Sequence, residues 1–528
     1  MVVPKRRLYL LHRWVGVILA APALLVFFSG AIAVFHHELH DWAHRGQDYR
    51  LASEVSNFDL DRAHAIAAEG VPEKYLAPVD IPQPKQRPMR FFFHAHDQVG
   101  GTIEEHGVSV DLDPQTLETV RRRSGPRADA MAPTVLESLG TFFFDLHIQL
   151  LMPETLGLVA TGIVGFALML LVVTGTFVHR PNLAKLSRRP RTGKARRLAG
   201  EVHTFVGSWT LPFTAVLAMT GAFFSFAGAV LIPVVAMTAF DGDQEALIRA
   251  VIGQVEVADS TAVAELGPIF DDAHRRADGT FDFITLDQWN QPGANVTVGI
   301  VEHASLGDHT RTFVYDGHTG ALIREKPIIG PVPSFGNTLF MLMADLHFGT
   351  LIGLVTKILW FVLGLATCAL ALVGLLVFVE RRGDQKRTTR TVGILTGALG
   401  GGLPLATAGA CLSWVIAGAS GVTDVSMTMT VVFFIGLIQA GVFVAWLPLR
   451  RAIGLAWGLA GVAFLAFPFL APLVTGLGPL AAWTQARASV AVDLGIVFVG
   501  LLLLSGAFSL RSVAAQTTHR AVESQVAV

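Results

Sequence analysis

The sequence predicts a polytopic membrane protein of the mainly α class, and three observations carry this prediction. Of its 528 residues, 52% are hydrophobic and only 15% are charged, whereas soluble domains average about 25% charged residues. The mean hydropathy is +0.53. Eight apolar runs are long enough to cross a bilayer, because a spanning helix needs about 20 predominantly apolar residues.

The composition also excludes some classes of function. A net charge of −1 leaves no excess of basic residues to attract nucleic acid, so we expect membrane lipid and no nucleic acid as a partner. Cys368 and Cys411 both lie inside apolar runs, where a thiol packs as a small hydrophobic group. A disulfide framework is therefore not predicted.

The predicted spans fall into two groups of four. The first four runs are 14–35, 156–178, 205–232 and 351–379. The second four are 392–416, 427–449, 453–475 and 489–510. Basic residues at 5–7 precede the first run, as in a signal peptide, but His-His-Glu at 36–38 stands where a cleavage site would need small residues. We therefore expect the first helix to be retained.

Basic residues gather in the short connections on one side of the membrane. They occupy residues 5–7, the loop 180–197, the segment 381–390 and Arg450–Arg451. Since short cytoplasmic loops carry an excess of Lys and Arg, we expect this side to be the cytoplasm, with both termini inside. The protein would then be a multi-pass protein of a bacterial inner membrane, with the long connections 36–152 and 233–346 in the periplasm.

Both long connections contain alternating runs that are typical of strands, such as residues 90–94 and 295–300. We therefore expect a periplasmic α+β domain in each connection. The expected division of the chain is 1–35 (N-terminus and first helix), 36–152 (first periplasmic domain), 153–232 (second and third helices with the basic loop), 233–346 (second periplasmic domain), 347–380 (fourth helix), 381–391 (basic linker), 392–512 (last four helices) and 513–528 (cytoplasmic tail).

A unit of helix, external domain and helix occurs twice. His-Arg-Trp-Val-Gly at 12–16 opens the first span, and His-Thr-Phe-Val-Gly at 203–207 opens the third. Asp-Leu-His at 145–147 precedes the second span and recurs at 345–347 before the fourth. The last four helices lack these histidines, which indicates an appended structural or partner-binding half.

A parallel duplication of two helices predicts a four-helix bundle with a pseudo-two-fold axis along the membrane normal. His12 would then face His203 near the cytoplasmic surface, and His147 would face His347 near the periplasmic one. Two opposed imidazoles are an arrangement that holds a haem iron from both sides. These four residues are therefore the candidate ligands of two haem groups, one at each face.

Other histidines compete for these roles, and each of the four also has a plainer interpretation as a polar anchor at a helix end. His179 ends the second span and is a rival cytoplasmic ligand, although Glu380 stands at its counterpart in the fourth. His36 and His37 follow the first span. They would replace a periplasmic ligand or line a substrate site, or they form a solvated cluster beside the membrane.

Further polar residues also have more than one interpretation. Lys357 lies within an apolar run, so it either snorkels to the surface or neutralises an anionic group such as a haem propionate. Asp145 and Asp345 would orient the neighbouring imidazoles or cap their helices. His94 and His96 share one face of a predicted strand and are a candidate pair of metal ligands.

The sequence shows no motif for an internal electron source. Gly400-Gly401-Gly402 lacks the strand–loop–helix context and the Lys that phosphate binding requires, so an internal nicotinamide or flavin site is not expected. Electrons would have to come from a separate cytoplasmic protein or from a membrane quinol.

The repeated motifs resemble those of the PepSY-associated transmembrane proteins, which include iron-regulated membrane proteins and ferric-siderophore reductases of Gram-negative bacteria. The resemblance covers roughly residues 1–390 and rests on 11–16 (LHRWVG), on Asp-Leu-His at 145–147 and 345–347, and on a strand–turn–strand pattern around 319–320. It implies PepSY-like external domains and a haem b-binding reductase that passes electrons outward to a ferric siderophore. The first copy departs from the second by four extra residues between His147 and Gly157, which shifts the outer ligands by about one helical turn.

Three functions remain open at this point. The first is a haem-containing oxidoreductase that reduces a ferric siderophore bound between the external domains. The second is a permease for a siderophore or its iron, although Lys357 and Asp493 are almost the only charges within the spans. The third is a sensor or interaction protein without redox chemistry.

Overall fold

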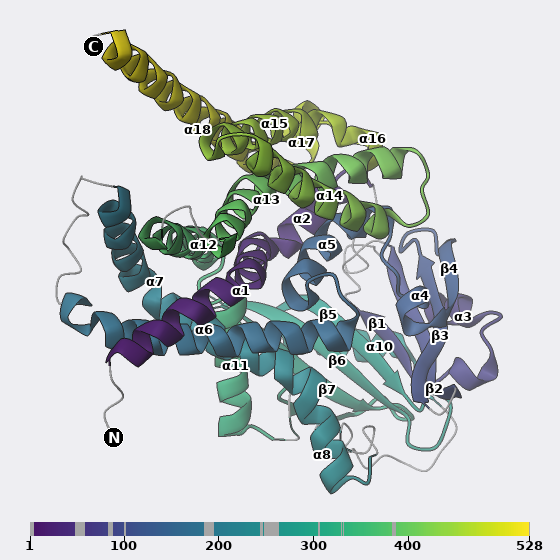
Figure 1. Cartoon of the computed structure of the whole chain (residues 1–528). Coiled ribbons are helices and arrows are strands. Elements are labelled where there is room, and N and C mark those ends of the chain that lie inside the picture. The colour runs from purple at the N-terminus through teal and green to yellow at the C-terminus, as the bar shows by residue number, and fades with distance from the viewer. Residues whose placement is uncertain are drawn as a thin grey trace. The chain divides into compact units, whose positions relative to one another are not determined.

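The computed structural model describes residues 5–47, 59–82, 88–99, 102–183, 195–242, 247, 263–304, 307–328, 330, 332–382 and 387–526. The chain divides into two compact units, which are described separately (Figure 1). The membrane unit comprises Met1–Gly46, Pro133–Leu231 and Lys357–Val528, and the sheet unit comprises Gln47–Ala132 and Ile232–Thr356.

Within the described ranges, eight helices are long and apolar enough to cross a membrane, so the polytopic, mainly α class is confirmed. The helices are α1 (Lys5–Ala33), α6 (Glu154–Leu183), α7 (Ala195–Phe226), α12 (Leu354–Arg382), α13 (Arg387–Ala419), α14 (Val425–Trp446), α15 (Leu449–Leu470) and α18 (Arg487–Val526). The last helix, α18, continues through most of the segment that the sequence analysis assigned to a tail. Much of the basic loop 180–197 and the side chain of His179 lie outside the described residues.

The helices of the repeated unit, α1, α6, α7 and α12, pack through small residues. A Cβ added at Gly165 of α6 would lie 2.9 Å from the backbone nitrogen of Ala222 on α7. A Cβ added at Gly364 of α12 would lie 3.1 Å from the Cβ of Ala31 on α1. Small residues at such crossings let helix backbones approach closely, which is typical of membrane bundles.

In the second group of helices, α13 is the most buried. In its most apolar stretch 61% of the residues are buried, against 22%, 39% and 22% for α14, α15 and α18. Gly402 of α13 lies against α14, where an added Cβ would be 2.8 Å from the Cβ of Ala440. At this position the glycine run 400–402 serves helix packing.

Two short helices beside the first bundle, α2 (His36–Ala43) and α5 (Val135–Gln149), belong to the membrane unit. They lie at the two ends of the connection 36–152 that the sequence analysis assigned to an external domain. Because α2 and α5 pack on membrane helices, the part of this connection in the sheet unit is narrower, 47–132.

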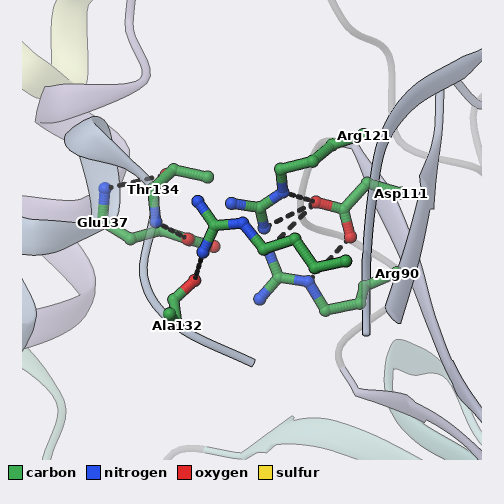
Figure 2. A network of polar contacts seen from close by, with 7 residues as sticks. Arg90, Asp111, Arg121, Ala132, Thr134 and Glu137 are labelled. Atoms are coloured by element: carbon green, nitrogen blue, oxygen red, sulfur yellow. Dashed lines mark hydrogen bonds and ion pairs between the residues drawn. The ribbon is translucent and has the colours of Figure 1, made fainter. Parts of the chain in front are cut away.

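The start of α5 is fixed by a capping box and by a contact with α13. The backbone N–H of Glu137 donates to the hydroxyl of Thr134 (3.2 Å), and the N–H of Thr134 donates to the carboxylate of Glu137 (2.6 Å) (Figure 2). Trp414 of α13 donates its indole N–H to the carbonyl of Val135 (2.6 Å). The two capping-box bonds satisfy backbone N–H groups at the start of the helix, and the bond from Trp414 anchors this end of α5 to α13.

The sheet unit is built on one antiparallel sheet with the strand order β4-β3-β2-β1-β5-β6-β7-β8. Its strands are β1 (Val79–Pro82), β2 (Met89–Val99), β3 (Thr102–Leu112), β4 (Thr119–Pro126), β5 (Gly279–Asp287), β6 (Asn295–Ala304), β7 (Gly307–Asp316) and β8 (Leu322–Lys326). Its helices include α3 (Leu60–Ala68), α4 (Arg127–Ala130), α8 (Ile232–Ala239), α10 (Leu266–Arg276) and α11 (Phe335–Phe348). The predicted strands 90–94 and 295–300 lie in β2 and β6.

The segments from the two long connections are joined in this sheet. One copy contributes α3 and then β1 to β4, the other α10 and then β5 to β8, and the copies meet where Val79 of β1 lies opposite Leu286 of β5. The carboxylate of Asp61 on α3 accepts hydrogen bonds from the backbone N–H groups of Leu266 (2.7 Å) and Gly267 (3.0 Å) at the start of α10. The two predicted external domains are therefore halves that share one sheet.

The two faces of the sheet differ in chemistry, as alternation along a strand requires. One face packs against α3 and α10 and carries the apolar core, which includes Phe91 and Phe93. On the opposite face Asp111 of β3 is 1% exposed. Its carboxylate accepts from Arg90 of β2 (2.8 Å) and Arg121 of β4 (2.9 Å) (Figure 2).

Candidate cofactor site

A cavity of about 260 Å³ lies within the membrane unit, among α1, α6, α7 and α12. Its walls are mostly apolar and include Val17, Leu168, Leu211, Leu370 and Leu375. His12 and His203 both line it. A concave, mostly apolar site with a few convergent polar groups is the usual form of a cofactor site, and we call it the His12–His203 cavity.

The structure brings His12 and His203 together at this cavity. Their ring centroids are 6.3 Å apart, and their planes are inclined by 76°. With a metal–nitrogen bond of about 2 Å, an axial imidazole has its centroid roughly 3.2 Å from the metal. Two such rings on opposite sides of one metal would have centroids roughly 6.4 Å apart, so the observed separation fits a shared iron.

The hydrogen bonds of the two rings indicate which nitrogen carries the proton. Nδ1 of His203 lies 3.2 Å from the carbonyl oxygen of Leu370, so it donates an N–H. Nδ1 of His12 lies 3.1 Å from the hydroxyl of Thr174, which directs its own proton to the carbonyl of Leu170 (2.6 Å). His12 is therefore also a donor. A neutral imidazole with its proton on Nδ1 has its lone pair on Nε2, so both rings would bind a metal through Nε2, oriented as metal-ligating histidines are.

Each ring also lies against a glycine of a neighbouring helix. A Cβ added at Gly175 of α6 would be 3.1 Å from Cε1 of His12. A Cβ added at Gly374 of α12 would be 3.2 Å from Cε1 of His203. Since α6 and α12 are the corresponding helices of the two copies, the repeat extends from the histidines to the surfaces on which they pack.

His147 follows the same pattern on α5. Its Nδ1 donates to the carbonyl of Val26 on α1 (2.9 Å), and a Cβ added at Gly30 of α1 would be 2.7 Å from its Cε1. His347 lies on α11, which belongs to the sheet unit. The pairing of His147 with His347 therefore stays a prediction.

The aspartates of the two Asp-Leu-His motifs are not helix N-caps. Asp145 and Asp345 lie in the C-terminal part of α5 and α11, and the N-caps of these helices are Thr134 and Ser334. The carboxylate of Asp345 accepts a hydrogen bond from the hydroxyl of Thr350 (2.8 Å). The capping interpretation made from the sequence is therefore wrong for both residues.

The rival outer histidines lie on α2. The ring of His36 has its centroid 5.6 Å from that of His37 and 5.6 Å from that of Phe144 on α5. Burial and the neighbouring charge of His37 lower the pKa of His36. His36 therefore packs against α5 and does not stand in a solvated cluster.

The two charged residues expected within the spans are both paired. Lys357 of α12 donates to the carboxylate of Glu38 (2.6 Å). Asp493 of α18 accepts from the guanidinium of Arg45 (2.5 Å) and from the indole N–H of Trp42 (2.8 Å). The structure therefore assigns Lys357 an ion pair within the chain, in place of the anionic ligand that the sequence left open.

His94 is held between two carboxylates. Its Nδ1 lies 2.8 Å from Glu105 and its Nε2 lies 3.2 Å from Asp80. Burial lowers the pKa of His94, but the hydrogen bonds with Asp80 and Glu105 outweigh it and raise the pKa to about 9. Across the described ranges, no group of three or more His, Cys, Asp or Glu side chains is arranged to hold a metal ion, so the structure does not support a metal site at His94 and His96.

Several residues of the cavity have no counterpart in the sequence analysis. Gly175 and Gly374 have the same role in the two copies, since each lies against the ring of one of the paired histidines. Tyr9 and Arg13 come from the first turns of α1, and Arg381 comes from the last turn of α12. The sequence analysis used basic residues at such helix ends only to orient the chain.

The fold and this site define a polytopic membrane protein with a duplicated unit, whose helices bring paired histidines to a mostly apolar cavity. The chain belongs to the family described as the PepSY-associated TM region, whose model matches residues 9–381. This match confirms the family to which the sequence motifs pointed, and it leaves the last four helices outside. No curated protein matches the chain.

Proposed function

We propose that this protein is a haem-containing oxidoreductase of a bacterial inner membrane, which passes electrons across the bilayer to reduce a ferric siderophore in the periplasm. The observation that carries the proposal is the pair His12 and His203, with ring centroids 6.3 Å apart beside an apolar cavity. This separation would suit two imidazoles that bind one metal, and haem is the metal cofactor that an apolar bundle core suits.

The residues around the cavity have distinct roles in this proposal. His12 and His203 would bind the iron through Nε2, while Thr174 and Leu370 fix the rings through Nδ1. The apolar walls would exclude water, which tunes the potential of the bound group. A haem bound here supplies one-electron chemistry.

A second haem b near the periplasmic face would complete the path. His147 would be one ligand, because its Nδ1 donates to Val26 (2.9 Å) in the same manner as in the two inner rings. His347 is its predicted partner, and His36 and His37 are the rival ligands. Reduction of the siderophore would need only proximity to this haem, so it requires no general acid or base.

The direction of electron flow follows from the distribution of charge. By the positive-inside rule, the basic residues at 5–7 and in 180–197 and 381–390 support an orientation with both termini in the cytoplasm. His12 would then lie near the cytoplasmic surface. A cytoplasmic protein or a membrane quinol would therefore deliver electrons to this end of the bundle.

A permease for the siderophore or its iron is the rival function. Transporters typically place polar groups and broken helices near the membrane midplane. Here Lys357 forms an ion pair with Glu38, and Asp493 forms one with Arg45. Neither charge is therefore available to a substrate. A sensor or interaction protein without redox chemistry is the third function, and it predicts a colourless protein.

Absorbance spectroscopy tests the cofactor. Purified protein should show a Soret band, and sharp visible bands should develop after reduction with dithionite. His12→Ala and His203→Ala should each remove the same haem, whereas His96→Ala, at an exposed position of β2, should retain the full haem content. A folded protein that takes up no haem would overturn the proposal.

Proteoliposomes test the direction and the substrate. With a reductant enclosed and a ferric siderophore outside, wild-type protein should deliver ferrous iron to an external chelator. A permease would instead carry iron inward without a reductant and would tolerate His12→Ala. Iron transport of that kind would favour the rival function.

A further inference from the structure

The charged residues that line the His12–His203 cavity are both arginines. Arg13 follows His12 on α1, and Arg381 lies in the last turn of α12. Among the described residues that line the cavity, none carries a carboxylate. The cavity beside the candidate iron ligands therefore has two fixed positive charges and no negative one to balance them.

Arg13 has hydrogen-bonding capacity that the chain does not use. Its Nε is buried and has no hydrogen-bond partner within the described part of the chain. Its guanidinium lies over the ring of Trp14, 5.3 Å from the centroid. A buried donor without an acceptor is unfavourable, so an acceptor supplied by a ligand would stabilise this arrangement.

Arg381 is held in place by Tyr9. It donates from Nη1 to the hydroxyl of Tyr9, and its guanidinium lies 5.7 Å from the centroid of that ring. A guanidinium presents further N–H donors in a planar fork that suits a carboxylate. Tyr9 therefore positions Arg381 while leaving part of the fork for an anion.

We propose that Arg13 and Arg381 bind the two propionates of the haem held by His12 and His203. This inference rests on the proposed function, because it presupposes a haem in the cavity. Haem b carries two carboxylates, and arginine is the residue that recognises carboxylates best. The propionate edge of the haem would then face the first turns of α1 and the last turn of α12, at the end of the bundle where electrons enter.

Both arginines also have a plainer interpretation, as anchors that extend to lipid headgroups at the membrane surface. The two interpretations differ in whether the arginines affect the stability and the reduction of the haem. A propionate partner stabilises the haem and favours its reduced state, because the ferrous haem carries one positive charge less than the ferric haem. If the arginines only anchor the helices to lipid, their contribution to haem binding does not depend on whether the propionates are ionised.

The test compares haem with its dimethyl ester, whose propionates cannot ionise. Apo-protein is reconstituted with each, in wild type, Arg13→Gln and Arg381→Gln, and haem release and the midpoint potential of this haem are measured. With natural haem, each variant should release haem about tenfold faster and have a lower midpoint potential. A tenfold change in the reduction equilibrium corresponds to about 59 mV for one electron. With the ester, wild type and variants should release the haem at the same rate.

Arg7→Gln is the matched control, because Arg7 lies on α1, is exposed and does not line the cavity. It should match wild type with either ligand. Arg13→Lys and Arg381→Lys preserve the charge, so they should retain the potential and lose only part of the affinity. These variants keep the test decisive if a Gln variant fails to fold.

The outcomes separate this inference from the proposed function. Wild-type protein that binds no haem would overturn the proposed function. If wild-type protein binds haem and both Gln variants have its haem release rate and midpoint potential, only the assignment of the arginines to the propionates is overturned. If the Gln variants release the natural haem and the ester faster by the same factor, the propionate assignment is also overturned, because the arginines would then act on the fold.

Discussion

Arg45, just beyond the end of α2, and Asp493 of α18 form an ion pair of 2.5 Å in which the two side chains are 0% and 6% exposed. Trp42 reinforces it by donating to the second carboxylate oxygen (2.8 Å), with its ring centroid 4.8 Å from the guanidinium. Because α18 belongs to the second group of helices, the pair ties that group to the short helix beside the first bundle. The last four helices therefore have a structural role in holding α2.

Asp493→Asn should destabilise the membrane unit strongly. It preserves an acceptor for Trp42 but leaves the charge of Arg45 buried and unbalanced, which costs about 3–5 kcal/mol. Thermal unfolding in detergent, followed by circular dichroism, measures the loss. Glu201→Gln is the control, because it breaks the exposed pair with Arg197 (3.0 Å) and should cost less than about 1 kcal/mol. Equal effects of the two substitutions would contradict the structural role.

Gly175→Ala should weaken haem binding without unfolding the bundle. The new Cβ would lie 3.1 Å from Cε1 of His12, and overpacking of this kind costs about 1–3 kcal/mol, so the affinity should fall roughly tenfold. Haem titration of the apo-protein measures it. Gly495→Ala is the matched substitution, because nothing lies within 4 Å of its added Cβ. Haem binding unchanged by Gly175→Ala would show that this contact does not position His12.

The principal residues of the candidate site were accessible from the sequence because the chain contains the unit twice. His12 and His203 open corresponding helices, so symmetry alone pairs them. The accompanying residues were not accessible in this way. The contact between Tyr9 and Arg381 depends on how α1 and α12 are rotated about their own axes, and an apolar run long enough to span a membrane does not determine that rotation.

The sequence likewise predicts individual strands of the sheet but not how its two halves are joined. The alternating runs at 90–94 and 295–300 predict strands directly, since one face of each is apolar. The junction of the two halves depends on β1, which is only four residues long and ends at Pro82. Its pairing with β5 is a long-range contact that local pattern cannot specify. The sequence therefore predicts two separate domains, whereas the structure has a single shared sheet.

His94 predicts a pH-dependent stability of the sheet unit. Burial lowers its pKa, but Asp80 and Glu105 raise it to about 9 in the folded protein, against about 6.5 in an unfolded chain. The protonated ring thus stabilises the fold fully below about pH 6.5, and this contribution is lost as the pH rises toward 9. Amide exchange of β2 and β3, corrected for its intrinsic pH dependence, should therefore accelerate over this range.

His94→Gln should abolish that pH dependence, because glutamine does not titrate. His96→Gln, on the same strand and exposed, should retain it. If amide exchange accelerates equally in wild type and His94→Gln, another titrating group is responsible. The contacts of His94 with Asp80 and Glu105 would then not cause the pH dependence.

The outer haem gives the last prediction. His147→Ala and His347→Ala should each lower the haem content from two per chain to one and leave the spectrum of the remaining haem unchanged. The bond from Nδ1 of His147 to Val26 (2.9 Å) makes His147 the better-supported ligand. Pyridine haemochrome content and the low-spin ferric electron paramagnetic resonance signal measure the loss.

The identity of the second outer ligand follows from the same series. The four extra residues after His147 shift the outer histidines relative to one another, which gives His36 and His37 the opportunity to replace His347. In that case His347→Ala would retain both haems, and His36→Ala or His37→Ala would lose the outer one. The double variant His147→Ala/His347→Ala should still retain the inner haem, because the rings of His12 and His203 are oriented by Thr174 of α6 and Leu370 of α12, which the double variant leaves unchanged. Loss of both haems from the double variant, in a protein that remains folded, would contradict two independent sites.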